Sequence, residues 1–156
     1  MRIREFSQEL TCIRELQSDP DFVRLPDEVI PLAILTVAKD GSLSTFGPEL
    51  ASTRSKAYGN FVIGNVLTDT PSEVASRQPF KRLARDVGVG RTRCEETCSY
   101  YSLCGGGFQS NRIAEHGTLF ATETTTCRLH RQTLADVVLS ELACESAGSS
   151  APTITA

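Results

Sequence analysis

The sequence predicts an α+β fold, because turn signals typical of a β-hairpin and start signals typical of helices occur in separate parts of the chain. Residues 40–41 (Asp-Gly) lie between two short apolar runs, and this dipeptide favours a tight hairpin turn. Residues 70–73 (Thr-Pro-Ser-Glu) combine an N-cap, a proline at the first helical position and a capping-box glutamate. Residues 128–143 carry apolar side chains at helical spacing.

The first half of the chain is expected to hold one helix and a small strand ribbon. Apolar residues recur at near-helical spacing over residues 7–18, so we expect an amphipathic helix capped by Ser7 and ended by Pro20. Its apolar face needs a partner elsewhere in the fold. Strands are expected at residues 32–38, 43–46 and 61–66, and the first two form the hairpin.

The second half is expected to contain short helices around an irregular loop. Pro79 should divide the next helical stretch into residues 71–76 and 79–87, with Gly88 just past the end. Residues 91–123 show no sustained periodicity and contain many glycines, which predicts an irregular, Cys-rich loop organised by a metal. A C-terminal helix follows over residues 128–143, and residues 144–156, rich in Ser, Thr, Ala and Pro, should form a disordered tail.

Composition fits one ordinary domain. The chain has 156 residues, of which 40% are hydrophobic and 22% charged. No apolar run approaches the roughly 20 residues that span a bilayer, and the N-terminus lacks the apolar core of a signal peptide. These features predict a cytoplasmic protein. A net charge of −3 is too small to indicate nucleic acid or a membrane as a partner.

Four of the six cysteines form the most informative pattern. Cys94, Cys98 and Cys104 lie within eleven residues, and Cys127 follows at a distance. Thiolates are the soft ligands that select iron–sulfur clusters and zinc, and a four-iron cluster requires four of them. Residues 105–107 are three glycines, which let backbone approach such a group closely. We therefore expect one [4Fe–4S] cluster on these four cysteines.

Zinc is the alternative that this spacing leaves open. Four thiolates bind Zn²⁺ tetrahedrally, although zinc motifs usually use tighter Cys-x2-Cys knuckles. His116 and His130 are expected to be ordinary histidines, because neither has a paired ligand spacing. Cys12 and Cys144 have no second cysteine nearby and are expected to be packed or free thiols. The flanking arginines are expected either to offset the charge of a cluster or to be surface charges: Arg91, Arg93, Arg112 and Arg128.

The stretch CEETCSYYSLCGGG at residues 94–107, continued by Asn111, residues 115–117 and residues 123–127, resembles a SPASM domain. This domain is the cysteine-rich C-terminal extension of radical S-adenosylmethionine enzymes that modify ribosomally made peptides. The resemblance covers about residues 28–142. Residues 46–50 (FGPEL) and 58–66 (YGNFVIGNV) are most similar to maturases that install cyclophane crosslinks in glycine-rich peptides.

Two departures from the family pattern limit what the resemblance implies. SPASM domains hold two auxiliary clusters, and the family ligands of the first map onto Phe46 and Phe108, so this site should be absent and partly filled by packing. The catalytic Cys-x3-Cys-x2-Cys loop is also missing, since Tyr101 stands where its third cysteine would lie. Only some 30 residues precede the matching region, whereas the radical enzyme needs a barrel of about 200 residues.

These observations predict a SPASM-like module with three parts: an N-terminal helical segment over residues 1–27, the iron–sulfur domain over 28–143, and the tail over 144–156. The resemblance implies docking of a precursor peptide and relay of an electron, within or beside a radical S-adenosylmethionine enzyme. A separate barrel chain is a further expected partner. The module alone is expected to have no catalytic residues. A zinc-stabilised structural or peptide-binding module remains the alternative.

Overall fold

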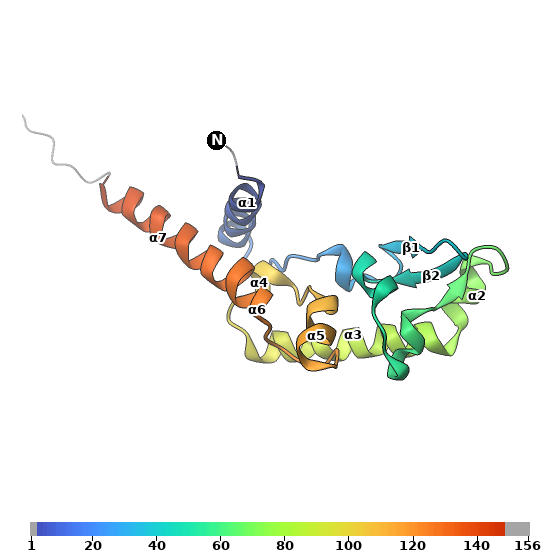
Figure 1. Cartoon of the computed structure of the whole chain (residues 1–156). Helices are drawn as coiled ribbons and strands as arrows, with labels where there is room; N and C mark the ends of the chain where they lie inside the picture. The colour runs from blue at the N-terminus through green and yellow to red at the C-terminus, as the bar shows by residue number, and fades with distance from the viewer. Residues whose placement is uncertain (1–2, 149–156) are drawn as a thin grey trace, which may run out of the picture.

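The structure is a computed structural model that describes residues 3–148, and it shows the α+β architecture that the sequence predicts. A small sheet lies at one end of the molecule and helices α1 and α7 at the other, while the long helix α3 runs from the sheet end towards α4 and α6 (Figure 1). The α-helices are α1 (Arg4–Ser18), α2 (Pro71–Ser76), α3 (Gln78–Thr97), α4 (Tyr101–Cys104), α5 (Gln109–His116), α6 (Thr125–Cys127) and α7 (Thr133–Gly148). Short 3-10 helices are η1 (Asp27–Val29), η2 (Pro48–Ser52) and η3 (Lys56–Phe61), and η4 (Arg128–Gln132) is a wide π-helical turn.

The sheet has three antiparallel strands in the order β1 (Leu35–Val37), β2 (Ser42–Thr45) and β3 (Gly64–Asn65). The predicted hairpin is confirmed: Leu35 pairs with Thr45, and Gly41 takes the left-handed conformation at φ 83°. Strands β1 and β3 are shorter than expected, and β2 lies one residue earlier in the chain than expected. Phe46 and Phe61 have left-handed φ values of 68° and 62°, so the backbone turns out of the strand conformation at both positions.

Most of the hydrophobic core lies between the sheet, the loops around it and α3. The side chains of Leu50, Phe61 and Leu119 are 0% exposed, and Phe46 is 1% exposed. The remaining buried members of this cluster come from the strands and from α2, α3 and α5: Leu43, Ile63, Val74, Phe80, Leu83, Val87 and Ile113. Burial of this apolar surface fixes α3 against the sheet and so determines where the cysteines at its far end lie.

Helix α1 finds its partner in α7 and α4, through a second, smaller cluster. Its core residues are Ile13, Leu103, Ala135 and Val138. The predicted start at Ser7 was wrong: α1 begins at Arg4, and the Ser7 hydroxyl donates to the Ile3 carbonyl oxygen at 3.2 Å inside the helix. The Glu9 carboxylate is fully buried and contacts Arg131 Nη1 at 3.4 Å, where burial raises the pKa of Glu9 despite this cation.

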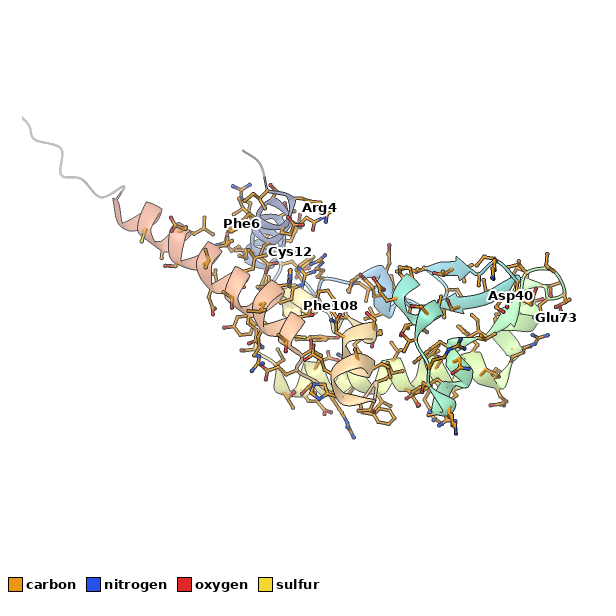
Figure 2. The ribbon with its side chains drawn as sticks, in the orientation of Figure 1. Arg4, Phe6, Cys12, Asp40, Glu73 and Phe108 are labelled. Atoms are coloured by element: carbon orange, nitrogen blue, oxygen red, sulfur yellow. The ribbon has the colours of Figure 1, made fainter. Side chains whose placement is uncertain are left out.

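The capping box at the start of α2 is present as predicted. The Thr70 hydroxyl accepts from the Glu73 amide at 3.4 Å, and the Glu73 carboxylate accepts from the Thr70 amide at 2.7 Å. Figure 2 shows Glu73 at the sheet end of the molecule, near Asp40 in the hairpin turn. Local sequence alone therefore located this helix start, because both partners of each hydrogen bond lie within four residues.

Helix α3 is longer than the sequence predicted. It was expected to end at Val87, with Gly88 just past the end, but it continues through Gly88 and Gly90 to Thr97. The reason is tertiary: Gly90 is buried beneath the Leu119 carbonyl and the Arg112 guanidinium, a contact for which only glycine is small enough. Packing of this last part of α3 offsets the cost of two glycines in a helix, about 1 kcal/mol each.

The expected irregular loop over residues 91–123 is instead largely helical. Its glycines mark helix ends, since Gly105 and Gly117 are the left-handed C-caps of α4 and α5 at φ 66° and 68°. The C-terminal helix is confirmed, but α7 extends to Gly148, so the expectation of disorder was wrong for residues 144–148. The rest of that expectation, residues 149–156, lies outside the described residues. Within residues 3–148, none of the helices has the length and apolar character needed to cross a membrane.

The two glycines of α3 provide a matched pair for testing this packing. Gly90→Ala should destabilise the protein by about 1–3 kcal/mol, because a Cβ would lie 2.0 Å from the Leu119 oxygen. Gly88→Ala should stabilise it by up to about 1 kcal/mol, because nothing lies within 4 Å and alanine favours helix. Urea unfolding followed by circular dichroism measures both. Equal effects of the two substitutions would contradict the close approach at Gly90.

Asp69 should make stability depend on pH in the acid range. Its carboxylate accepts hydrogen bonds from both terminal nitrogens of Arg77, from the Asn65 amide at 2.7 Å and from the Thr68 hydroxyl at 3.0 Å. The Arg77 hydrogen bonds are the main reason that the pKa of Asp69 falls to about 2. This stabilisation is complete above the unfolded-state pKa near 3.8 and is lost as pH falls towards 2.

Asp69→Asn should therefore lower the urea midpoint at neutral pH and flatten its decline between about pH 4 and pH 2. Asp27→Asn serves as the control, because Asp27 is an exposed residue of η1. Urea midpoints measured across that pH range check the expectation. A profile for Asp69→Asn that is parallel to that of the unmodified chain would show that the Asp69–Arg77 pair contributes nothing.

Candidate functional site

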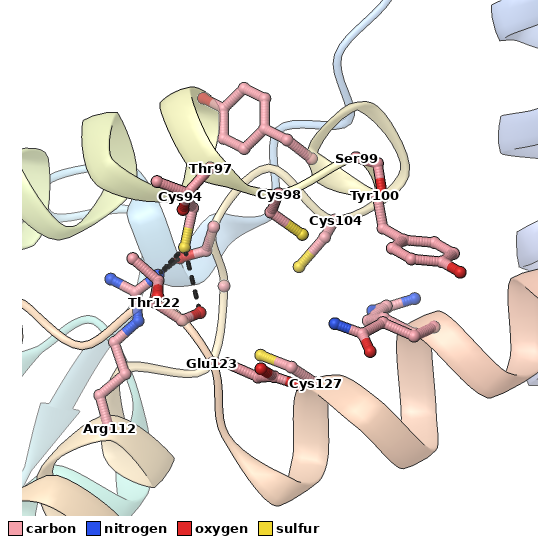
Figure 3. Close-up of a pocket in the computed structure, with 15 residues that line it drawn as sticks. Cys94, Thr97, Cys98, Ser99, Tyr100, Cys104, Arg112, Thr122, Glu123 and Cys127 are labelled. Carbon is pink, nitrogen blue, oxygen red and sulfur yellow. Dashed lines mark hydrogen bonds between the residues drawn. The ribbon is translucent and has the colours of Figure 1, made fainter.

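The four cysteines of the sequence pattern line one cavity. Its volume is about 160 Å³, and Figure 3 shows all four thiols pointing into the same space. The other lining residues are Thr97, Ser99, Tyr100, Tyr101, Gly106, Gly107, Arg112, Thr122, Glu123, Arg131 and Gln132. Cys127, which is distant in the sequence, thus joins the other three in space. None of the six cysteines of the chain, all within the described range, forms a disulfide.

Three helices position the four thiols. Cys94 lies in the last turn of α3, and Cys98 is the residue at which α3 ends. Cys104 is the last residue of α4, and Cys127 ends α6 just before the π-helical turn. Thr124 caps α6, because its hydroxyl accepts from the Cys127 amide at 3.1 Å, and this contact holds Cys127 at the cavity. Three helix ends, those of α3, α4 and α6, therefore meet around the cavity.

The thiols surround a space rather than a single point. Across residues 3–148, no group of three or more His, Cys, Asp or Glu side chains is arranged to hold a metal ion. A zinc ion would need all four sulfurs at about 2.3 Å from one centre. The cavity volume of about 160 Å³ is instead comparable with the roughly 150 Å³ that admits benzene in an engineered core.

Arg112 on α5 connects directly to the cavity. Its side chain is 0% exposed, and its Nη2 donates to the Cys94 sulfur at 2.9 Å and to the Gly106 carbonyl at 3.2 Å. Its Nη1 donates to the Leu119 carbonyl at 3.2 Å. The guanidinium therefore places a fixed positive charge beside a sulfur where negative charge would develop on ligand binding.

Burial favours the protonated form of two of the cavity thiols, Cys94 and Cys98. It raises the pKa of Cys94 to about 11 despite the opposing Arg112 charge, and the other three cysteines raise it further. The Cys94 thiol itself donates to the Thr122 carbonyl at 3.3 Å. Burial also raises the pKa of Cys98. Any metal that binds as a thiolate complex must displace these protons.

The other flanking arginines have different partners. Arg91 Nε donates to the Tyr101 hydroxyl at 2.8 Å, and Arg93 Nη1 donates to the Phe120 carbonyl at 3.3 Å. Arg128 lies 3.9 Å from the Glu123 carboxylate in an exposed pair. Of the four arginines that the sequence singled out, only Arg112 hydrogen-bonds to a cavity cysteine.

The remaining candidate residues lie elsewhere. Cys12 lies on α1 (Figure 2) and packs in the second cluster, and Cys144 is exposed on α7. His116 is exposed, with Nε2 at 2.8 Å from the Glu123 carbonyl oxygen. His130 is exposed on η4. None of these four side chains lines the cysteine cavity.

Sequence reasoning missed Arg131, which lines the cysteine cavity. It lies on the π-helical turn η4, where a wider helical turn aims side chains differently from an α-helix. Its guanidinium carbon is 5.3 Å from the centre of the Phe108 ring, and its Nη1 contacts Glu9 on α1. No local signal marks this residue, because its contacts come from α1 and from the segment before α5.

Phe46 and Phe108, the two positions where the family pattern has cysteines, line a second cavity together. Its volume is about 330 Å³. Phe46 is 1% exposed and belongs to the main core, whereas Phe108 is half-buried at the start of α5. The two residues therefore meet in space, 62 residues apart in the chain. Packing fills this region only in part, because the cavity between them remains.

Comparison with known proteins gives one relative to report. A protein of Synechocystis sp. (strain PCC 6803), named as the uncharacterized protein sll1766, is 39% identical over 141 residues. The match covers 90% of this chain and 34% of the relative, so the chain spans about a third of the relative's length. No family model matches the chain, and no solved structure matches it. By themselves, the fold and the site define an α+β domain with a cysteine-lined cavity.

Replacement of Arg112 tests whether the guanidinium holds the cavity wall. Arg112→Met should destabilise the metal-free protein by about 2 kcal/mol, because the buried Leu119 carbonyl loses its donor. Arg93→Met is the matched control, since Arg93 is exposed and should cost under about 0.5 kcal/mol. Urea unfolding under reducing conditions provides the measurement. The assignment fails if both arginine variants are equally stable.

Proposed function

We propose that this chain binds one [4Fe–4S] cluster through Cys94, Cys98, Cys104 and Cys127. The observation that carries the proposal is that these four thiols, from the ends of three helices, line one cavity. In a four-iron cluster each cysteine binds a different iron, so the sulfurs must surround a core rather than meet at a point. Four thiols around a cavity of about 160 Å³ are compatible with that requirement.

The surroundings of the thiols suit a negatively charged cluster. A cluster held by four thiolates carries net negative charge, and hydrogen bonds to its sulfurs stabilise that charge. Arg112 already donates to the Cys94 sulfur, and Gly106 and Gly107 form part of the wall. Four protein thiolates leave no iron free for a substrate. The bound cluster would therefore accept and release electrons or give structural support, while the residues of this chain hold it in place.

We further propose that the module belongs to, or works beside, a radical S-adenosylmethionine enzyme that modifies ribosomally made peptides in the cytoplasm. The support is the SPASM-like motif at residues 94–127 together with the length of the Synechocystis relative, two thirds of which lies outside the match. In such an enzyme the module would help to dock the precursor peptide and relay an electron. The barrel that carries the radical chemistry would then be a further part of the protein or a separate chain.

A zinc-stabilised structural or peptide-binding module is the second candidate. The same four thiols favour it, because thiolates are also ligands for Zn²⁺. Zinc binding would require all four sulfurs to lie about 2.3 Å from one centre, and within residues 3–148 no group of three or more His, Cys, Asp or Glu side chains is arranged to hold a metal ion. The two candidates differ in colour, metal content and bound sulfide, so one preparation distinguishes them.

Anaerobic reconstitution of the full chain with iron and sulfide, and separately with zinc, tests both candidates. We expect about four iron and four sulfide per chain and a broad absorption band at the blue end of the visible spectrum. Cys104→Ser should lose most of this iron, because one corner of the cluster loses its ligand. Metal analysis and visible absorption give the readout.

Two cysteines outside the cavity provide the controls. Cys144→Ser and Cys12→Ser should keep the full iron content, since neither side chain lines the cavity. Unchanged iron in Cys104→Ser would refute the ligand assignment. One zinc per chain in a colourless sample that takes up no iron would instead support the second candidate.

A further inference from the structure

The cavity between Phe46 and Phe108 has a chemistry of its own, distinct from that of the cysteine cavity. It is lined by Glu28, Phe46, Glu49, Phe108, Gln109, Ser110, Asn111, Thr126 and His130. Two carboxylates and two phenyl rings thus share one wall. The cysteine cavity, by contrast, is lined by two arginines. No lysine or arginine is among the lining residues of the Phe46–Phe108 cavity, all of which lie in the described part of the chain.

The two carboxylates of this cavity form no salt bridge with a described residue, and His130 is the one basic side chain among the lining residues. Glu28 on η1 is half-buried and Glu49 on η2 is exposed, and they come from two different elements. Neither side chain takes part in any of the ion pairs formed among residues 3–148. Arg131, whose guanidinium lies over the Phe108 ring, contacts Glu9 and lines the cysteine cavity instead.

Gln109 provides an independent indication of a missing partner. Its side chain is 1% exposed, and its Nε2 donates to the Gly106 carbonyl at 3.0 Å, which fixes the orientation of the amide. Its Oε1 is then buried without a hydrogen-bond donor among the described residues. A buried acceptor without a donor costs about 1–3 kcal/mol. Gln109 is among the residues that line this cavity, so a ligand N–H group that reaches its Oε1 gains that contact.

The aromatic wall suits the same kind of ligand. Cations are attracted to the faces of phenyl rings, and the Phe108 ring already makes such a contact with Arg131 at 5.3 Å. An alkyl stem can pack against the apolar rings while its charged end meets the carboxylates, as lysine and arginine side chains do on protein surfaces. Negative charge, aromatic rings and an unpaired acceptor together select an organic cation with N–H donors.

We propose that the Phe46–Phe108 cavity binds the alkylammonium or guanidinium end of a basic side chain from a peptide. Glu28 and Glu49 supply the charge, Phe108 supplies the aromatic face, and Gln109 supplies the unpaired acceptor. This site is separate from the four cysteines and does not require a cluster. It gives the module a preference for peptides with lysine or arginine.

Titration of the full chain with Nα-acetyl-lysine methylamide, followed by NMR, tests the proposal. The uncharged norleucine analogue has a similar alkyl chain and serves as the matched ligand. We expect the lysine probe to bind more tightly than the norleucine probe and to shift the side-chain amide signals of Gln109 and Asn111. Raising the salt concentration should weaken binding, because exposed charges are screened.

Two substitutions locate the site. Glu28→Gln and Glu49→Gln should each weaken binding of the lysine probe about two- to fivefold, the range typical of exposed ion pairs. Glu95→Gln, at an exposed position on α3, should leave it unchanged. Cys104→Ser should also leave it unchanged, which separates this site from the cluster proposal. Equal binding of the two probes, no binding of either, or no effect of the Glu28 and Glu49 substitutions would overturn the proposal.

Discussion

The contact between the Arg112 guanidinium and its neighbours is the constraint on which the cysteine cavity depends. Arg112 comes from α5, and it bonds to the Cys94 sulfur on α3, to the Gly106 carbonyl after α4 and to the Leu119 carbonyl after α5. A fully buried guanidinium is costly unless such acceptors surround it. The three segments must therefore keep their positions, and Gly90 leaves the space in α3 that this arrangement needs.

The two hydrophobic clusters act on the cavity from opposite sides. The main cluster fixes α3 and α5 through Leu83, Val87 and Ile113, and so places Cys94 and Arg112. The second cluster joins α1, α4 and α7 through Ile13, Leu103 and Ala135, and so places Cys104 beside the segment that carries Cys127. The N-terminal helix is consequently part of the same packed unit as the cysteine segment, rather than a separate appendage.

Glycine positions show how the same residue type can help or mislead a prediction. Gly41 correctly indicated a hairpin turn, because a tight turn needs a left-handed residue within four positions. Gly88 indicates a helix end that does not exist, since α3 continues for about three more turns while Gly90 packs against Leu119. Gly105 and Gly117 contribute to the prediction of an irregular loop, although they end α4 and α5.

The sequence by itself determined the features whose partners are close along the chain: the α+β class, the hairpin, the capping box of α2 and the group of cysteines at residues 94–104. It also singled out Cys127, but its place at the cavity was decided by α6 and the packing of α7 on α1. Only tertiary structure selected Arg112 from four arginines, brought Arg131 to the cysteines and left a cavity between Phe46 and Phe108. The physical reason is that hydrogen bonds and packing between distant segments leave no periodic or local trace in the sequence.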